Sequence, residues 1–166
     1  MSEKRKVYIE SSVISYFANR RSTNLIVAAY QEITFEWWET EINKFDCFIS
    51  QFVIDEISQG DDNAAAARLK VIENFPLLEL SYEVKELAYH YLSEINIPRK
   101  AQLDAFHIAA AVVNGMDYIL SWNFHHMANV FIKEKIRKLN ASLGYSTPEI
   151  CTPEELIVEK GENNEK

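Results

Sequence analysis

The sequence has only two cysteines, no long hydrophobic run and no internal repeat. Cys47 and Cys151 have no neighbouring Cys or His at the spacing of metal ligands, so we expect two reduced thiols at strand positions. No apolar run approaches membrane-spanning length, and the apolar segment near the start is too short for the core of a signal peptide. We therefore expect a cytoplasmic protein without membrane contact.

Positive charge is also scarce. The chain has 17 Lys and Arg against 25 Asp and Glu, a net charge of −8. This balance argues against a protein that binds nucleic acid by neutralising its backbone non-specifically. It does not exclude a nuclease whose metal ions supply the local positive charge.

Length and composition indicate one folded domain. The chain has 166 residues, of which 48% are hydrophobic and 25% charged, as in ordinary globular proteins. We expect one domain over residues 1–157. Residues 158–166 are charged and have no apolar anchor, so we expect a disordered tail there.

Short apolar runs alternate with helical stripes, which predicts βα units around a parallel sheet. The expected strands are residues 7–9, 47–50, 77–80 and 118–122, with a weaker one around Ile150. The expected helices include residues 24–44, 84–95 and 101–114, the last ending at Gly115, and another beginning at Thr152. The apolar arc of the 24–44 helix, which carries Trp37 and Trp38, is wider than one core contact needs. We interpret it as core and dimer surface rather than a base-stacking platform.

Three acids are expected at one edge of this sheet. Glu10 directly follows the first strand, and Glu56 lies in the helical segment just after the second. Asp104 lies in the first turns of the 101–114 helix, which must begin near the carboxyl ends of the strands. Ligands bind at that edge in open α/β sheets. Asn123 follows the strand 118–122 and adds an amide oxygen, so the set suits Mg²⁺ or Mn²⁺ better than Zn²⁺.

Four segments around these residues resemble the successive motifs of PIN domains, in particular the VapC-type toxins of bacterial toxin–antitoxin systems. They are residues 7–14, 53–57, 103–109 and 119–123, and the resemblance extends over residues 5 to 157. It implies a three-layer α/β/α sandwich with a central parallel sheet. It also implies a metal-dependent endoribonuclease, the toxin of a toxin–antitoxin pair, acting on RNA as a homodimer restrained by a cognate antitoxin.

The chain departs from this pattern at two of the four acids. Glu10 and Asn123 stand where the family usually has Asp. Glu adds a methylene and can still bind a cation at a shifted position, whereas Asn keeps an oxygen ligand but loses a charge. We treat both as features of a subtype.

We expect Glu10, Glu56 and Asp104 to bind the cation, and Asn123 to complete the catalytic set. Ser12 and Ser121 would orient water or a phosphate oxygen, and Arg99 and Lys100 would contact the RNA backbone. His107, one helical turn after Asp104, is interpreted as a hydrogen-bonded structural residue, with a ligand or general base as the alternative.

Three further alternatives stay open. The chain could be a catalytically weakened PIN-like module that binds RNA or protein, or a small-molecule phosphohydrolase. His125 and His126 could approach phosphate or simply begin a helix.

Overall fold

The computed structural model describes residues 3–123 and 130–157. Its centre is a parallel sheet with the strand order β2-β1-β3-β4. The strands are β1 (Arg5–Ile9), β2 (Phe45–Phe48), β3 (Tyr118–Leu120) and β4 (Glu149–Cys151). Because all four strands run in one direction, their carboxyl ends meet at one edge, where Ile9 lies opposite Leu120 and Tyr8 opposite Phe48.

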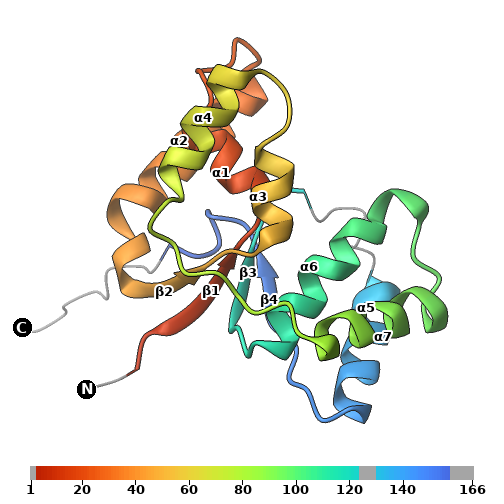
Figure 1. The fold of residues 1–166 in the computed structure, drawn as a ribbon. Helices are drawn as coiled ribbons and strands as arrows, with labels where there is room; N and C mark the ends of the chain where they lie inside the picture. Colours follow the sequence, from red (N-terminus) through yellow and green to blue (C-terminus); the bar gives the residue numbers. More distant parts are fainter. Residues whose placement is uncertain (1–2, 124–129, 158–166) are drawn as a thin grey trace, which may run out of the picture.

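Helices cover the sheet in two groups. The first group is α1 (Ser11–Ala18), α2 (Leu25–Thr40), α3 (Gln51–Ile57) and α4 (Asp62–Val71). The second is α5 (Tyr82–Glu94), α6 (Gln102–Val113) and α7 (Val130–Ser142). Figure 1 shows the first group on one side of the molecule and the second on the other, with the sheet between them. This is the expected three-layer α/β/α sandwich. Two short 3-10 helices, Ile42–Lys44 and Arg99–Ala101, precede β2 and α6.

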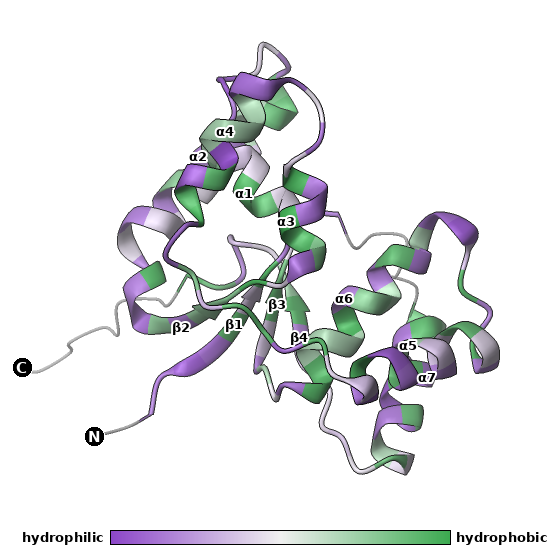
Figure 2. Ribbon diagram, in the orientation of Figure 1, coloured by the Kyte–Doolittle hydropathy of each residue, from purple (hydrophilic) through white to green (hydrophobic). Residues whose placement is uncertain are grey.

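The core lies between the sheet and its closest helices. Val7, Tyr8 and Ile9 of β1 are fully buried, as are Ala109 and Ala110 of α6. Figure 2 shows hydrophobic residues along both the strands and α6. The outer helix α2 carries both kinds of residue (Figure 2), as expected for a helix that faces the core with one side only. In the described residues, no helix is long and apolar enough to cross a membrane.

Several sequence predictions are confirmed. The strands at residues 7–9, 47–50 and 118–122 and around Ile150 are present within one to two residues of their expected bounds. Gly115 follows α6 and adopts a left-handed backbone with φ of 70°, which prevents the helix from continuing. Cys47 and Cys151 are free thiols on β2 and β4, and burial raises the pKa of each to about 12.

Two predicted elements are wrong. Residues 77–80 form no strand; Leu77 makes a single parallel bridge to Ile49 beyond the end of β2. Pro76 precedes the bridge and has no N–H to extend the pairing. The helix expected from Thr152 is absent as far as the structure describes it, because residues 153–156 form only turns. Thr152 and Glu155 do make the expected capping hydrogen bonds, but a single turn is a costly helix nucleus. The predicted tail, residues 158–166, lies outside the described residues.

Candidate functional site

The fold places the three predicted acids at the carboxyl edge of the sheet. Glu10 directly follows β1 and is the N-cap of α1. Glu56 belongs to α3, which begins three residues after β2. Asp104 lies in the first turn of α6, which runs back toward the start of β3. Each acid is therefore fixed by an element that begins or ends at this edge.

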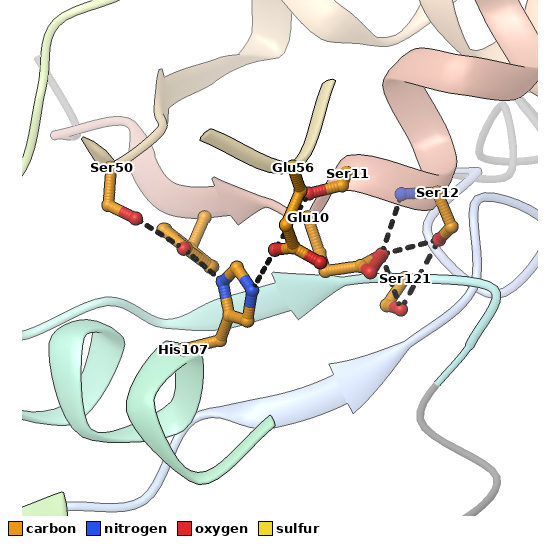
Figure 3. Close-up of polar contacts among 8 residues, drawn as sticks. Glu10, Ser11, Ser12, Ser50, Glu56, His107 and Ser121 are labelled. Atoms are coloured by element: carbon orange, nitrogen blue, oxygen red, sulfur yellow. Dashed lines mark hydrogen bonds and ion pairs between the residues drawn. The ribbon is translucent and has the colours of Figure 1, made fainter. Parts of the chain in front are cut away.

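Glu10 is almost completely buried, with 4% of its surface exposed. Its Oε2 accepts hydrogen bonds from the backbone N–H of Ser12 at 2.9 Å, from the Ser12 hydroxyl, and from the Ser121 hydroxyl at 2.9 Å (Figure 3). A buried carboxylate requires such donors. Within the described residues Oε1 accepts no hydrogen bond, so one oxygen holds the side chain in place while the other remains available.

Glu56 is held by a second set of hydrogen bonds. Its Oε1 accepts from the Ser11 hydroxyl at 3.1 Å and pairs with Nε2 of His107 (Figure 3). Burial raises the pKa of Glu56, but the hydrogen bond from His107, its nearby charge and the Ser11 hydroxyl outweigh burial, and the net pKa is lowered. Glu56 is therefore ionised at neutral pH. Its neighbour Asp55 accepts a hydrogen bond from the Gln51 side chain at 2.9 Å. Asp55 points in another direction because adjacent residues of a helix lie on different faces.

Asp104 is the most perturbed acid at this edge. Its pKa is raised from 3.8 to about 7, mainly by burial; His107 opposes the rise, and the negative charges of Glu10 and Glu56 add to it. Glu10 and Glu56 thus both lie within electrostatic reach of Asp104. In the described part of the chain, however, no three His, Cys, Asp or Glu side chains already stand close enough to hold one metal ion.

The remaining predicted residues divide into two groups. Ser12 and Ser121 join the site through Glu10, and the Ser12 hydroxyl also accepts from the backbone N–H of Trp122 at 2.9 Å. The backbone N–H of Asn123 donates to the Ser121 hydroxyl at 3.0 Å, but Asn123 itself is exposed. Arg99 and Lys100 are exposed in the 3-10 helix just before α6. His125 and His126 lie outside the described residues.

Asp117, which directly precedes β3, has a structural role. Its carboxylate accepts from the backbone N–H of Lys6 at 2.8 Å. Its own N–H donates to the Lys6 carbonyl at 2.9 Å. Both bonds lie at the amino edge of the sheet, away from the three acids.

Sequence reasoning missed two residues that support the site. Tyr8 and Ser50 are fully buried, and the Tyr8 hydroxyl lies 2.7 Å from the Ser50 hydroxyl and 2.5 Å from Nδ1 of His107. The signal for Tyr8 was present, because residues two apart on a strand face the same side and Tyr8 is two residues before Glu10. Ser50 directly follows the β2 segment, where a polar residue also points to the carboxyl edge.

No family model matches the sequence, and no curated protein matches it. Two solved structures share its fold. One is Mycobacterium tuberculosis VapC20, a toxin that cleaves the sarcin–ricin loop, with 13% identity and a TM-score of 0.59 over 75% of this chain and 95% of that chain. The other is VapBC2 from Rickettsia felis, bound to a DNA fragment from its promoter, with 9% identity and a TM-score of 0.58 over 89% of this chain and 98% of that chain. The expected VapC-type PIN fold is therefore confirmed as a fold.

Proposed function

We propose that this protein is a metal-dependent endoribonuclease and the toxin of a toxin–antitoxin pair. The observation that carries the proposal is the convergence of three acids from distant parts of the sequence on the carboxyl edge of the sheet. Burial, and then the negative charges of Glu10 and Glu56, raise the pKa of Asp104, so carboxylates gather where a parallel sheet binds ligands. The fold shared with VapC20 supports RNA cleavage, and the fold shared with VapBC2 supports an antitoxin partner.

The donor set fits Mg²⁺ or Mn²⁺ in its chemistry. Clustered carboxylates repel one another, and a hard divalent cation with oxygen ligands relieves that repulsion. Glu10 and Glu56 each keep one oxygen without a hydrogen bond in the described part of the chain. A cation shared with Asp104 would require side-chain adjustment, for which half-buried Asp104 has room.

Each residue at this edge would contribute a separate function. Glu10, Glu56 and Asp104 would hold the cation, which would supply an activated water and neutralise charge on the scissile phosphate. The hydroxyls of Ser12 and Ser121 fix the Glu10 carboxylate through hydrogen bonds. The exposed side chains of Arg99 and Lys100 would bind RNA phosphates beside Asp104.

One observation favours a binding module without catalysis. Glu10 already has a complete structural role, because Oε2 caps α1 and accepts three hydrogen bonds. A second observation also favours the binding module: Asn123 is exposed and its side chain is uncharged.

Metal titration with a matched variant separates the two proposals. The enzyme predicts saturable Mn²⁺ binding and cleavage of single-stranded RNA, both lost in Asp104→Asn. Asp55→Asn is the control, because Asp55 is an exposed acid on α3 that bonds to Gln51 instead of facing the site. RNA binding without Mn²⁺ binding would support the module. Hydrolysis of simple phosphate esters without RNA cleavage would support the phosphohydrolase.

The toxin role has its own test. Induced expression of the wild-type chain should arrest bacterial growth, whereas Asp104→Asn should not. Co-expression of a short open reading frame adjoining the gene should relieve the arrest and yield a complex that purifies with the chain. Growth arrest by both forms would contradict a catalytic toxin.

A further inference from the structure

A buried row of polar side chains runs behind Glu56. It leads from the Ser50 hydroxyl to the Tyr8 hydroxyl at 2.7 Å, from there to Nδ1 of His107 at 2.5 Å, and from Nε2 of His107 to Oε1 of Glu56 (Figure 3). Tyr8 and Ser50 are fully buried and His107 is 2% exposed. These residues come from β1, the end of β2 and α6, so three separate elements cooperate to hold one carboxylate.

The chemistry of the row fixes the role of His107 toward Glu56. An ionised carboxylate only accepts hydrogen bonds, so Nε2 of His107 must donate to it. The Tyr8 hydroxyl can donate to Nδ1 of a neutral imidazole or accept from a charged one, and Ser50 can take the complementary role. His107 therefore presents the same N–H to Glu56 in either protonation state.

Glu56 needs such support because its side chain is partly exposed. Its side chain is 36% exposed, against 2% for His107. A glutamate has three rotatable bonds, and ordering it on a ligand costs free energy that prior hydrogen bonds remove. The Ser11 hydroxyl and His107 both bind Oε1, which leaves Oε2 without a hydrogen bond from any residue that the structure describes.

We propose that Tyr8 and His107 are positioning residues, which hold Oε1 of Glu56 so that Oε2 is ready for the divalent cation. His107 is then neither a metal ligand nor a general base, since both of its ring nitrogens are occupied by Tyr8 and Glu56. The consequence for cation binding rests on the proposed function. The ordering of Glu56 does not.

Calorimetric titration of the full chain with Mn²⁺ at one fixed pH tests the consequence. Loss of hydrogen bonds behind a metal-binding side chain typically weakens affinity about 10- to 100-fold. We expect about tenfold weaker binding in His107→Leu and a several-fold loss in Tyr8→Phe. His107→Gln places an amide N–H near the position of Nε2 and should recover most of the affinity.

Tyr91→Phe is the matched control. Tyr91 is also a fully buried tyrosine whose hydroxyl makes a side-chain hydrogen bond, but to Asn140 and away from the three acids. Its removal should destabilise the fold comparably and leave Mn²⁺ affinity unchanged. Equal losses of affinity in Tyr8→Phe and Tyr91→Phe would reduce the role of Tyr8 to general stability and overturn the proposal.

A measurement without metal keeps the two proposals distinguishable. Side-chain NMR relaxation should show Glu56 in one rotamer in the wild type and averaged among several in His107→Leu and Tyr8→Phe. If Glu56 stays equally ordered in both variants, the positioning role is wrong, whatever the metal does. If the wild type binds no Mn²⁺ but the ordering changes as expected, the positioning role stands and the proposed nuclease function fails.

Discussion

At the scale of single residues, the Glu10 side chain makes two kinds of structural contact. It caps α1 by accepting from the Ser12 N–H, and it reaches across to the Ser121 hydroxyl after β3. These bonds use Oε2 alone, so capping would leave Oε1 for the proposed cation. Glu has one more methylene than the Asp usual in the resembled family, so its carboxylate reaches further from the backbone.

Asp104 should carry an energetic cost in the metal-free protein. Its pKa rises from 3.8 unfolded to about 7 folded, so the folded state holds the proton more tightly and stability falls as pH rises between these values. At pH 8 with chelator, Asp104→Asn should stabilise the fold by about 1 kcal/mol after allowance for solvent screening, raising Tm by roughly 2–4 °C. Thermal unfolding should show this gain shrinking toward pH 4.

Asp55→Asn serves as the control for that measurement, because Asp55 is exposed and outside the acidic group. A fall in Tm for Asp104→Asn at both pH values would assign Asp104 a structural role. The gain should also disappear in saturating Mn²⁺, since only the wild type would then be stabilised by binding.

Asn123→Asp tests whether the end of β3 belongs to the site. The Asn123 backbone is bonded to the Ser121 hydroxyl, which in turn bonds to Glu10. A carboxylate here would add charge near the cation, and additional ligand charge strengthens binding of hard cations. We expect a several-fold gain in Mn²⁺ affinity by calorimetry. Identical affinity would leave Asn123 as a turn residue, where Asp is equally acceptable.

The sequence could predict which edge of the sheet a residue faces where a strand end fixed its direction. Glu10, Glu56 and Ser121 could be placed because carboxyl ends of parallel strands share an edge. The directions of Tyr8 and Ser50 could be predicted, but their supporting role could not, because a buried tyrosine or serine is indistinguishable from ordinary core until its hydroxyl partners are known. Those partners lie 42 and 99 residues away in sequence.

At the scale of elements, periodicity predicted strands and amphipathic helices but missed two helices. The sequence of α4, Asp62–Val71, has a run of alanines and little apolar contrast between its faces. Its position depends instead on Arg68, whose guanidinium donates to the carbonyls of Ile57 and Gln59 after α3. Such tertiary hydrogen bonds have no periodic signal. The other helix, α7, follows residues that lie outside the described part of the chain, and its pattern was not identified.

Helix α2 was predicted to offer apolar surface beyond its core contact. Phe35 and Trp38 are half-buried, and the most exposed large hydrophobic residues lie near the start of the helix, where Leu25 is 86% and Ile26 65% exposed. We expect the double variant Leu25→Ser with Ile26→Ser to weaken the proposed homodimer or antitoxin complex. Sedimentation should show the shift toward monomer, with Tm nearly unchanged because both side chains are exposed in the single chain.

Tyr82→Ser on α5 is the control for the α2 variant, because Tyr82 is 76% exposed on the opposite group of helices. Equal loss of association in both variants would indicate non-specific hydrophobic contact. A wild-type chain that stays monomeric and binds no antitoxin would remove the interface altogether.

At the scale of the whole molecule, the net charge of −8 restricts how RNA can bind. A protein that neutralises Z phosphates of a single strand loses affinity with salt at a logarithmic slope of about −0.7Z. Arg99 and Lys100 are the basic pair expected beside the site, so a chain that relies on them and on a cation should show a shallow slope of about −1.4. Most of its affinity would then depend on the divalent ion.

The measurement uses the wild-type chain with a non-cleavable RNA analogue in Mn²⁺, because the inactive variant Asp104→Asn should lose the cation. We expect a salt titration to give the slope of about −1.4. Replacing Arg99 and Lys100 with Gln should bring the slope toward zero. Replacing Arg137 and Lys138 with Gln provides the control, since Arg137 pairs with Glu149 at the amino end of β4 and Lys138 with Glu134 on α7. These distant charges should leave the slope unchanged. A steep slope that does not change when Arg99 and Lys100 are replaced would show that RNA binds through another basic surface. The carboxyl edge would then not be the RNA-binding site.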